Sequence, residues 1–199
     1  MDLIKNRDKV IEIEKNLEKT PKEGEVWLHL GCGDRIWDNW HNIDKYNIKN
    51  PRVMQTDMYN LFMYPDNSID GIYSSHSLEH LPIRHARLAL KEWYRVLKPN
   101  SMLWLMIPDL EQICKNIINP NINFAAKYFW YLHTMYGWQT DSNTRNPGLD
   151  AEIDYGQFHT CGFTEELIKF YLNEDGYKVI DFMPYDGWNT PSLYIQAIK

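Results

Sequence analysis

The sequence predicts an α/β domain in which helices cover both faces of a mostly parallel sheet. Three observations predict this fold: short, almost wholly apolar strand segments, amphipathic helical segments between them, and Pro, Gly, Asn and Asp at the junctions. The chain has 199 residues, of which 44% are hydrophobic and 24% charged. This size and composition suit one soluble domain with a sizeable core, so we expect a single domain over residues 1–199.

The first half of the chain begins with a unit over residues 1–24, an amphipathic helix at 2–19 followed by a Pro/Gly turn. The fourth expected strand follows the turn Pro65-Asp66-Asn67-Ser68, in which proline fixes φ and the polar side chains bond the local backbone. The strands expected in this half lie at 26–30, 40–44, 52–56 and 69–74.

The second half begins with a helix from Pro82, a residue suited to a first helical turn, to Leu97. Residues 98–101 are expected to end that helix before a strand at 102–107. Thr164 is a good N-cap for a helix that reaches Asn173. Two strands, at 177–182 and 192–198, are expected to close the domain. Residues 119–160 are predicted to be an insertion or lid over the substrate site, with an aromatic helix at 128–138 and a mobile loop at 140–148.

Composition limits the partners and the compartment. The net charge is −6 and no Lys/Arg cluster is present, which argues against nucleic-acid binding. No apolar run reaches the roughly 18 residues of a membrane span, and no apolar segment of a signal peptide follows Met1. The three cysteines lack paired metal-ligand spacing, so we expect reduced thiols in a cytoplasmic protein. The sequence does not indicate an oligomeric state.

Three consecutive strands are expected to carry ligand-binding features at their ends. Gly31-Cys32-Gly33 follows the first strand and turns toward a helix, and glycine lets backbone N–H groups approach a ligand closely. Asp44 ends the second strand and can accept hydrogen bonds from two ribose hydroxyls. Asp57 follows the third and could contact an adenine amino group, with the Met58 N–H facing the ring. Either aspartate could instead only cap a loop, but the succession favours an adenosine-containing ligand.

Several segments together resemble the class I S-adenosylmethionine-dependent methyltransferases, in particular small bacterial members associated with sugar and cell-surface glycan pathways. The resemblance covers residues 26–116 well and 156–182 more loosely, and its motifs specify the fold and cofactor rather than a substrate. The segments are Leu28-His29-Leu30-Gly31-Cys32-Gly33, Asn42-Ile43-Asp44, Pro65-Asp66-Asn67-Ser68-Ile69-Asp70, Ser75-His76-Ser77-Leu78-Glu79-His80-Leu81, Glu92-Trp93-Tyr94-Arg95-Val96-Leu97-Lys98-Pro99, Ile107-Pro108-Asp109-Leu110-Glu111 and His159-Thr160-Cys161-Gly162-Phe163-Thr164.

The resemblance implies a Rossmann-like sheet of seven strands with an antiparallel last strand, and S-adenosylmethionine as cofactor. It implies that the Gly31–Gly33 loop passes the methionine part, that Asp44 holds the ribose and that Asp57 contacts the adenine. Two departures stand out: Asp34-Arg35 replaces small residues, and Asn100-Ser101 replaces a glycine pair, where asparagine tolerates φ > 0. The expected cofactor-binding residues are Leu30, Gly31, Cys32, Gly33, Asp44, Asp57, Met58, Ser75 and His76.

The segment His76-Ser77-Leu78-Glu79-His80 matches the H-x-x-E-H pattern of some zinc proteases. That chemistry needs both histidines on a sustained helix and a third ligand elsewhere. Here Pro82 follows at once and a buried strand precedes, so a short turn at the cofactor edge is expected and no metal site is predicted.

His80 and His159 are the candidate catalytic residues, because neutral imidazole can accept a proton from an acceptor hydroxyl near pH 7. Each could instead only bond the backbone to shape its loop.

We therefore expect a methyltransferase acting on a hydroxyl or amine of a small polar molecule, a sugar or nucleotide-sugar being the first candidate. The acceptor would lie between the 76–81 turn, Asp109 and the 119–160 insertion. The aromatic side chains of the insertion could stack on sugar rings or simply pack as core. Two alternatives remain: an NAD-dependent oxidoreductase, although the third glycine of G-x-G-x-x-G is missing near Trp37, and a non-catalytic module that binds a partner.

Overall fold

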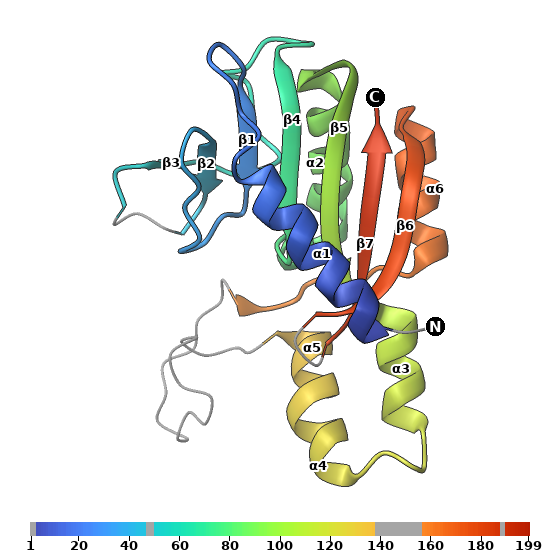
Figure 1. Ribbon diagram of the computed structural model, residues 1–199. Helices are drawn as coiled ribbons and strands as arrows, with labels where there is room; N and C mark the ends of the chain where they lie inside the picture. The colour runs from blue at the N-terminus through green and yellow to red at the C-terminus, as the bar shows by residue number, and fades with distance from the viewer. Residues whose placement is uncertain (1–2, 47–49, 138–156, 188–189) are drawn as a thin grey trace.

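The computed structural model describes residues 3–46, 50–137, 157–187 and 190–199. These residues form one seven-stranded sheet in the order β3-β2-β1-β4-β5-β7-β6 (Figure 1). Neighbouring strands from β3 to β5 are parallel, whereas β7 runs antiparallel to both β5 and β6. This confirms the predicted sheet and its antiparallel last strand. The strands are β1 (Trp27–Leu30), β2 (His41–Asp44), β3 (Val53–Gln55), β4 (Ile69–Ser75), β5 (Leu97–Pro108), β6 (Lys178–Asp186) and β7 (Pro191–Ile198).

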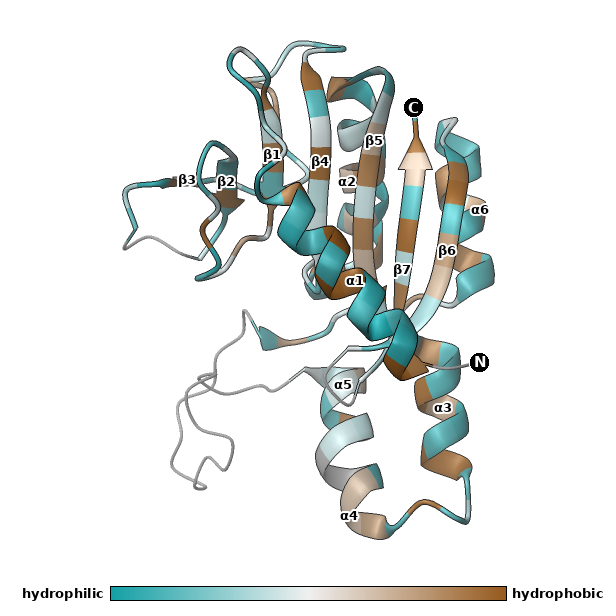
Figure 2. Ribbon diagram, viewed as in Figure 1, coloured by the Kyte–Doolittle hydropathy of each residue, from teal (hydrophilic) through white to brown (hydrophobic). Residues whose placement is uncertain are grey.

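Helices cover both faces of the sheet, as predicted. Helix α1 (Leu3–Leu17) crosses one face, and α2 (Ile83–Val96) and α6 (Glu165–Asp175) pack on the other (Figure 1). Apolar residues recur along β4, β5 and β7, while the exposed side of α1 is hydrophilic (Figure 2). Side chains alternate between the two faces of a strand, so β1 contributes Leu28 and Leu30 to one core and Trp27 to the other.

One predicted boundary was wrong at the start of β5. Helix α2 ends at Val96, before residues 98–101 as expected, but these residues already belong to β5, which begins at Leu97 rather than at 102. Asn100 takes φ +66°, a conformation asparagine tolerates, and its N–H donates to the carbonyl of Lys199. After β5 the chain enters α3 (Leu110–Ile118), which was not predicted and is capped by Asp109, whose carboxylate accepts from the Gln112 N–H at 3.0 Å. Asp109 therefore has a structural role as the N-cap of α3.

The loop between β1 and β2 does not turn into a helix, contrary to expectation. Trp37 and Trp40 are buried there, with ring centroids 4.9 Å apart, and Trp37 also contacts the Tyr73 ring at 4.4 Å. The buried Asn42 side chain holds the loop: its oxygen accepts from the Trp37 N–H, and its amide donates to the Trp37 and Trp40 carbonyls. Aromatic packing on one face of the sheet thus replaces the helix.

The predicted insertion contains an aromatic helix, as expected, built from α4 (Phe124–Ala126), a π-helical turn η2 (Lys127–Leu132) and α5 (His133–Tyr136). Trp130 is 39% exposed and Tyr136 54% exposed, so these two rings are not core residues. The predicted mobile loop at 140–148 lies outside the described residues. The role of residues 119–160 as a lid stays a prediction.

None of the helices within the described ranges combines the length and apolar character that crossing a membrane requires.

Candidate functional site

The carboxyl ends of β1, β2 and β4 meet at one edge of the sheet, and the glycine loop lies there. Gly31 and Gly33 take φ values of +66° and +51°, which glycine adopts at little cost. The N–H groups of Gly31 and Cys32 both donate to the Ile43 carbonyl, at 2.8 and 3.2 Å, so the loop is fixed to β2. Leu30 and Cys32 are buried, which leaves their backbone rather than their side chains for a ligand.

Ser77, a residue the sequence reasoning missed, fixes the path of this loop. It is buried, its hydroxyl lies 2.8 Å from that of Ser74 and donates to the Leu30 carbonyl at 3.3 Å. A Cβ on Gly31 would overlap the Ser77 side chain, whereas a Cβ on Gly33 would meet nothing within 4 Å. Gly31 is therefore required for close packing as well as for its φ.

Gly31→Ala and Gly33→Ala form a matched pair, because both glycines have positive φ but only Gly31 abuts Ser77. We expect Gly33→Ala to lower the free energy of unfolding by about 1 kcal/mol and Gly31→Ala by about 2–4 kcal/mol. Urea unfolding of the two variants measures the difference. Equal losses would show that Ser77 gives way and that the close packing does not matter.

Asp44 ends β2 beside the glycine loop. Its Oδ2 accepts from the Gly33 N–H at 2.9 Å, and its Oδ1 accepts from the Tyr46 N–H at 2.7 Å. Each carboxylate oxygen can accept more than one hydrogen bond, so these contacts orient Asp44 and leave it able to accept further donors. The structure thus joins the first two predicted features, the loop and the carboxylate.

Asp57 follows β3 and is paired with Lys45, whose Nζ lies 3.0 Å from Oδ1. The hydrogen bond and charge of Asp57 raise the pKa of Lys45. Met58 is held by its carbonyl, which accepts from the Trp93 indole N–H at 2.8 Å. An adenine contact by Asp57 would have to coexist with this ion pair, which the sequence did not reveal.

Arg35, the first departure from the family pattern, ties the glycine loop to α1. Its guanidinium lies 3.2 Å from the Glu14 carboxylate and 4.9 Å from the centroid of the Trp37 ring, and it donates to the Tyr73 hydroxyl at 3.3 Å. Tyr73 in turn donates to Glu14. Arg35 therefore points away from the loop backbone and into an anchoring network on the α1 face.

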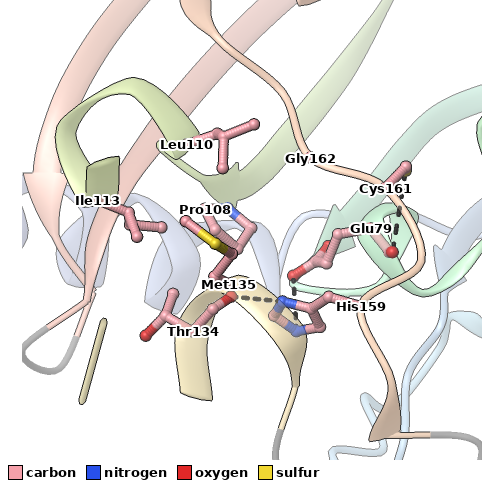
Figure 3. Close-up of a pocket in the computed structure, with 9 residues that line it drawn as sticks. All are labelled: Glu79, Pro108, Leu110, Ile113, Thr134, Met135, His159, Cys161 and Gly162. Carbon is pink, nitrogen blue, oxygen red and sulfur yellow. Dashed lines mark hydrogen bonds and ion pairs between the residues drawn. The ribbon is translucent and has the colours of Figure 1, made fainter. Parts of the chain in front are cut away.

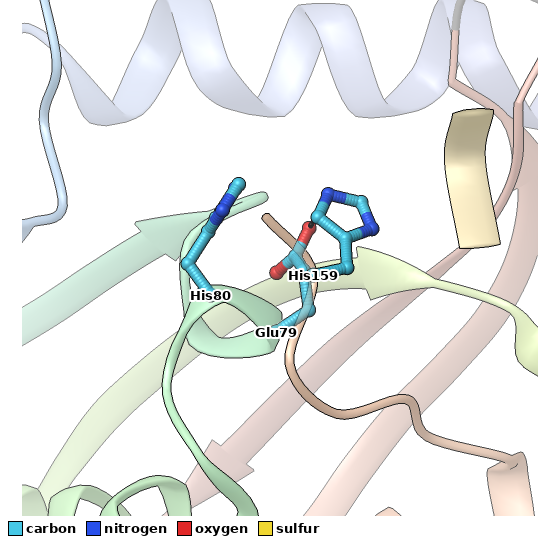
Figure 4. Close-up of side chains that lie close together, drawn as sticks. All are labelled: Glu79, His80 and His159. Atoms are coloured by element: carbon cyan, nitrogen blue, oxygen red, sulfur yellow. Dashed lines mark ion pairs between the residues drawn. The ribbon is translucent and has the colours of Figure 1, made fainter. Parts of the chain in front are cut away.

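The turn after β4 brings two neighbouring residues together with a third that is distant in sequence. The 3₁₀ turn η1 (Leu78–His80) is the predicted short turn, and it carries Glu79 and His80. His159 comes from a distant segment that is bonded to η1: Thr160 and Cys161 N–H groups donate to the Glu79 carbonyl at 2.9 and 3.2 Å. The rings of His80 and His159 lie 4.7 Å apart at 85°, on either side of the Glu79 carboxylate (Figure 4). We call Glu79, His80 and His159 the histidine–glutamate cluster.

Backbone carbonyls fix the tautomers of both histidines. His80 Nδ1 lies 3.1 Å from the Phe158 carbonyl, and His159 Nδ1 lies 2.6 Å from the Thr134 carbonyl. A carbonyl only accepts, so both Nδ1 atoms carry hydrogen and a neutral ring keeps its lone pair on Nε2. The His159 Nε2 lies 3.9 Å from Glu79 Oε1. Both predicted catalytic residues are thus poised to accept at Nε2.

Glu79 is the charged centre of the cluster and is only 1% exposed. Burial alone would raise its pKa, but the neighbouring histidines, His76 foremost, lower it to about 2. His76 follows β4 with φ +48°, and its Nδ1 lies 3.5 Å from Glu79 Oε1, a long distance for a hydrogen bond. The pKa of His159 is lowered, chiefly by burial, which favours its neutral form.

A small pocket opens beside this cluster (Figure 3). Glu79 and His159 line one side, and the rest is lined by mostly apolar residues of β5, α3 and α5 together with the Cys161–Gly162 segment. It has room for about one water-sized group. Its lining residues are Glu79, Pro108, Leu110, Ile113, Thr134, Met135, His159, Cys161 and Gly162.

Comparison with known proteins agrees with this geometry. Residues 28–105 match the family model described as a methyltransferase domain. No curated protein sequence matches the chain significantly.

Solved structures of similar fold include an S-adenosylmethionine-dependent methyltransferase from Archaeoglobus fulgidus, with a TM-score of 0.58 and 16% identity over 97% of this chain and 94% of that one. A second S-adenosylmethionine-dependent methyltransferase, from Methanosarcina mazei, has a TM-score of 0.60 and 16% identity, and the match covers 92% of this chain and 96% of that one. A third structure is the 1,6-didemethyltoxoflavin-N1-methyltransferase of Burkholderia thailandensis with bound 1,6-didemethyltoxoflavin and S-adenosylhomocysteine. Its TM-score is 0.58 and its identity 13%, and the match covers 100% of this chain and 79% of that one.

Residues 28–105 therefore match a methyltransferase domain, and the described residues share the class I fold of solved S-adenosylmethionine-dependent methyltransferases.

Proposed function

We propose that this protein is an S-adenosylmethionine-dependent methyltransferase that acts on a hydroxyl or amine of a small polar acceptor, with a sugar or nucleotide-sugar as the first candidate. The observation that carries the proposal is the histidine–glutamate cluster, which holds two imidazole rings 4.7 Å apart at the carboxyl edge of the sheet, that of His159 lining a pocket. A hydroxyl must lose a proton when it is methylated, and an imidazole can accept one. The sugar candidate rests on the family resemblance alone.

The residues at the glycine loop fit the cofactor. Gly31 and Gly33 expose backbone at positive φ, no atom would obstruct even a Cβ at Gly33, and Asp44 is oriented beside them. S-adenosylmethionine supplies an electrophilic methyl group on a sulfonium. We assign Asp44 to the ribose hydroxyls, the loop backbone to the methionine part, and Asp57 with Met58 to the adenine. Ser75 and His76, at the end of β4, are proposed to border the same ligand.

Asp44→Ala is expected to weaken binding of S-adenosylhomocysteine by about 1–3 kcal/mol, the scale of lost hydrogen bonds to a charged group. Isothermal titration calorimetry measures the affinity. Asp44→Asn is the matched control, since it keeps one acceptor oxygen and should lose less. An affinity unchanged in Asp44→Ala would remove this residue from the ribose role.

The acceptor is proposed to lie between the 76–81 turn, Asp109 and the 119–160 insertion. One neighbour of similar fold binds a small substrate, 1,6-didemethyltoxoflavin, which supports a small-molecule acceptor in general terms. Exposed rings such as Trp130 and Tyr136 offer stacking surfaces for a sugar.

Two measurements test the proposal. Calorimetry with S-adenosylmethionine and with NAD should show binding of the first, and binding of NAD alone would favour an oxidoreductase. A screen of sugars, nucleotide-sugars and amines for S-adenosylhomocysteine release should then identify the acceptor. Binding of neither cofactor would favour a partner-binding module.

A further inference from the structure

The histidine–glutamate cluster contains a buried carboxylate that has no close hydrogen-bond donor among the described residues, since His76 Nδ1 lies 3.5 Å from Glu79 Oε1. Neither oxygen of the Glu79 carboxylate makes a hydrogen bond within the described part of the chain. The side chain is 1% exposed, so bulk water does not solvate it. Burying an ionised carboxylate is costly unless it is paired or coordinates a metal. A cation bound to this carboxylate would balance its charge.

The two histidines beside it have the arrangement of metal ligands. One nitrogen of each ring and one oxygen of Glu79 all lie within 4.8 Å of one another (Figure 4). Metal-binding histidines commonly donate their other N–H to a backbone carbonyl, which fixes the ring and directs the lone pair. His80 and His159 both do so, through the Phe158 and Thr134 carbonyls. Nε2 is therefore the available ligand atom of each ring.

We infer that Glu79, His80 and His159 bind one divalent transition-metal ion, through a carboxylate oxygen and the two Nε2 atoms. Two imidazoles and one carboxylate suit Zn²⁺, Co²⁺, Fe²⁺ or Mn²⁺, whereas Mg²⁺ and Ca²⁺ prefer all-oxygen sites. An ion about 2.1 Å from each donor requires donors about 3.5 Å apart, so the side chains would close by about 1 Å. No metal site was expected from the sequence, because Pro82 rules out the sustained helix that the H-x-x-E-H pattern needs; the ligand set inferred here instead takes in His159, which is remote in sequence.

The pocket beside the cluster gives such an ion an open side. Glu79 and His159 line this pocket, which has room for about one water-sized group. A metal-bound oxygen loses its proton more readily than a free one, so an acceptor hydroxyl in that position would be activated by the ion. In that form the two Nε2 atoms serve as ligands rather than as proton acceptors. This consequence rests on the proposed function, but metal binding itself does not.

Metal titration of the chelator-treated protein tests the inference without any acceptor. Zn²⁺ is followed by calorimetry and Co²⁺ by its visible absorption. We expect one site per chain, binding at least 10-fold weaker in Glu79→Gln and in His159→Ala, and unchanged binding in His41→Ala, whose exposed histidine lies at the start of β2. Mg²⁺ at the same concentration should not compete.

Affinity for S-adenosylhomocysteine shows whether each variant is folded. If His159→Ala fails this folding control, His159→Gln is used in its place, because glutamine keeps roughly the size of the side chain. Absence of Zn²⁺ and Co²⁺ binding in the wild type would overturn the inference, as would binding that neither Glu79→Gln nor a His159 variant weakens. Either result would leave the methyltransferase proposal standing, because the acceptor screen is a separate measurement.

Discussion

Between pH 7 and pH 5 the protein is expected to lose about 2 kcal/mol of its free energy of unfolding through His29 alone. His29 lies in β1, buried, between the rings of Trp37 at 4.7 Å and Tyr73 at 5.0 Å. Burial, and then the charge of Arg35, lower its pKa from 6.5 to about 3. The folded protein therefore keeps this imidazole neutral where the unfolded chain protonates it.

The sign of the effect follows from proton counting. Between pH 3 and 6.5 the unfolded state binds a proton at His29 that the folded state does not, so stability falls as the pH falls. The full loss over that window is about 5 kcal/mol, at about 1.4 kcal/mol for each pH unit. Above pH 6.5 both states are neutral at this position and the contribution is constant.

His29→Phe isolates this contribution, because phenylalanine fills a similar volume among the same rings and cannot be protonated. Urea unfolding of both proteins at several pH values gives the difference between their free energies of unfolding. From pH 7 to pH 5 the wild type should lose about 2 kcal/mol of its free energy of unfolding relative to His29→Phe. The titration of all other groups affects both proteins equally and cancels in the difference. A difference that does not change with pH would contradict the lowered pKa.

Replacing either His80 or His159 by alanine is expected to reduce turnover by about 10²–10⁴-fold with the identified acceptor, the range for loss of a proton-transfer group. Affinity for S-adenosylhomocysteine should stay within about two-fold, because these rings lie at η1 and the 157–163 segment rather than at the glycine loop. Steady-state kinetics and calorimetry on the same preparations measure the two quantities.

His41→Ala serves as the control histidine, since its ring contacts only Tyr64 among the described hydrogen bonds, at 2.8 Å from the hydroxyl. Unaffected turnover in both cluster variants would end the catalytic role of these histidines. A loss of turnover is expected whether the rings accept a proton or hold an ion, and the metal titration separates those two roles.

Local patterns predicted the sheet well because apolar strands and turn residues act over a few positions. The strand ends that carry Asp44 and Asp57, and the short turn after β4, followed from the same reasoning. The expected helix after Gly33 failed, since the aromatic side chains Trp37 and Trp40 pack onto the sheet face instead. Tertiary packing of this kind overrides a local pattern.

Contacts between distant segments could not be predicted from one sequence. The approach of His159 to Glu79 depends on backbone hydrogen bonds between residues about 80 positions apart. The pairing of Asp57 with Lys45, and the packing of Ser77 on Gly31, also depend on the folded geometry rather than on a motif. A small buried serine beside a positive-φ glycine has no distinctive pattern in sequence.

The contacts of helix α1 with β6 set the order in which these two parts of the chain can fold. Its Asn6 amide donates to the Pro184 carbonyl at 2.8 Å, and Arg7 and Lys9 lie 3.7 and 3.6 Å from Asp186 and Asp181 of β6. An isolated helix of 15 residues is marginal in water, so α1 needs that surface. During synthesis, therefore, α1 must wait for a strand made some 170 residues later before it can dock. Until α1 docks, the tryptophan-rich face of the nascent sheet is uncovered, and this exposed apolar surface is the kind that chaperones bind.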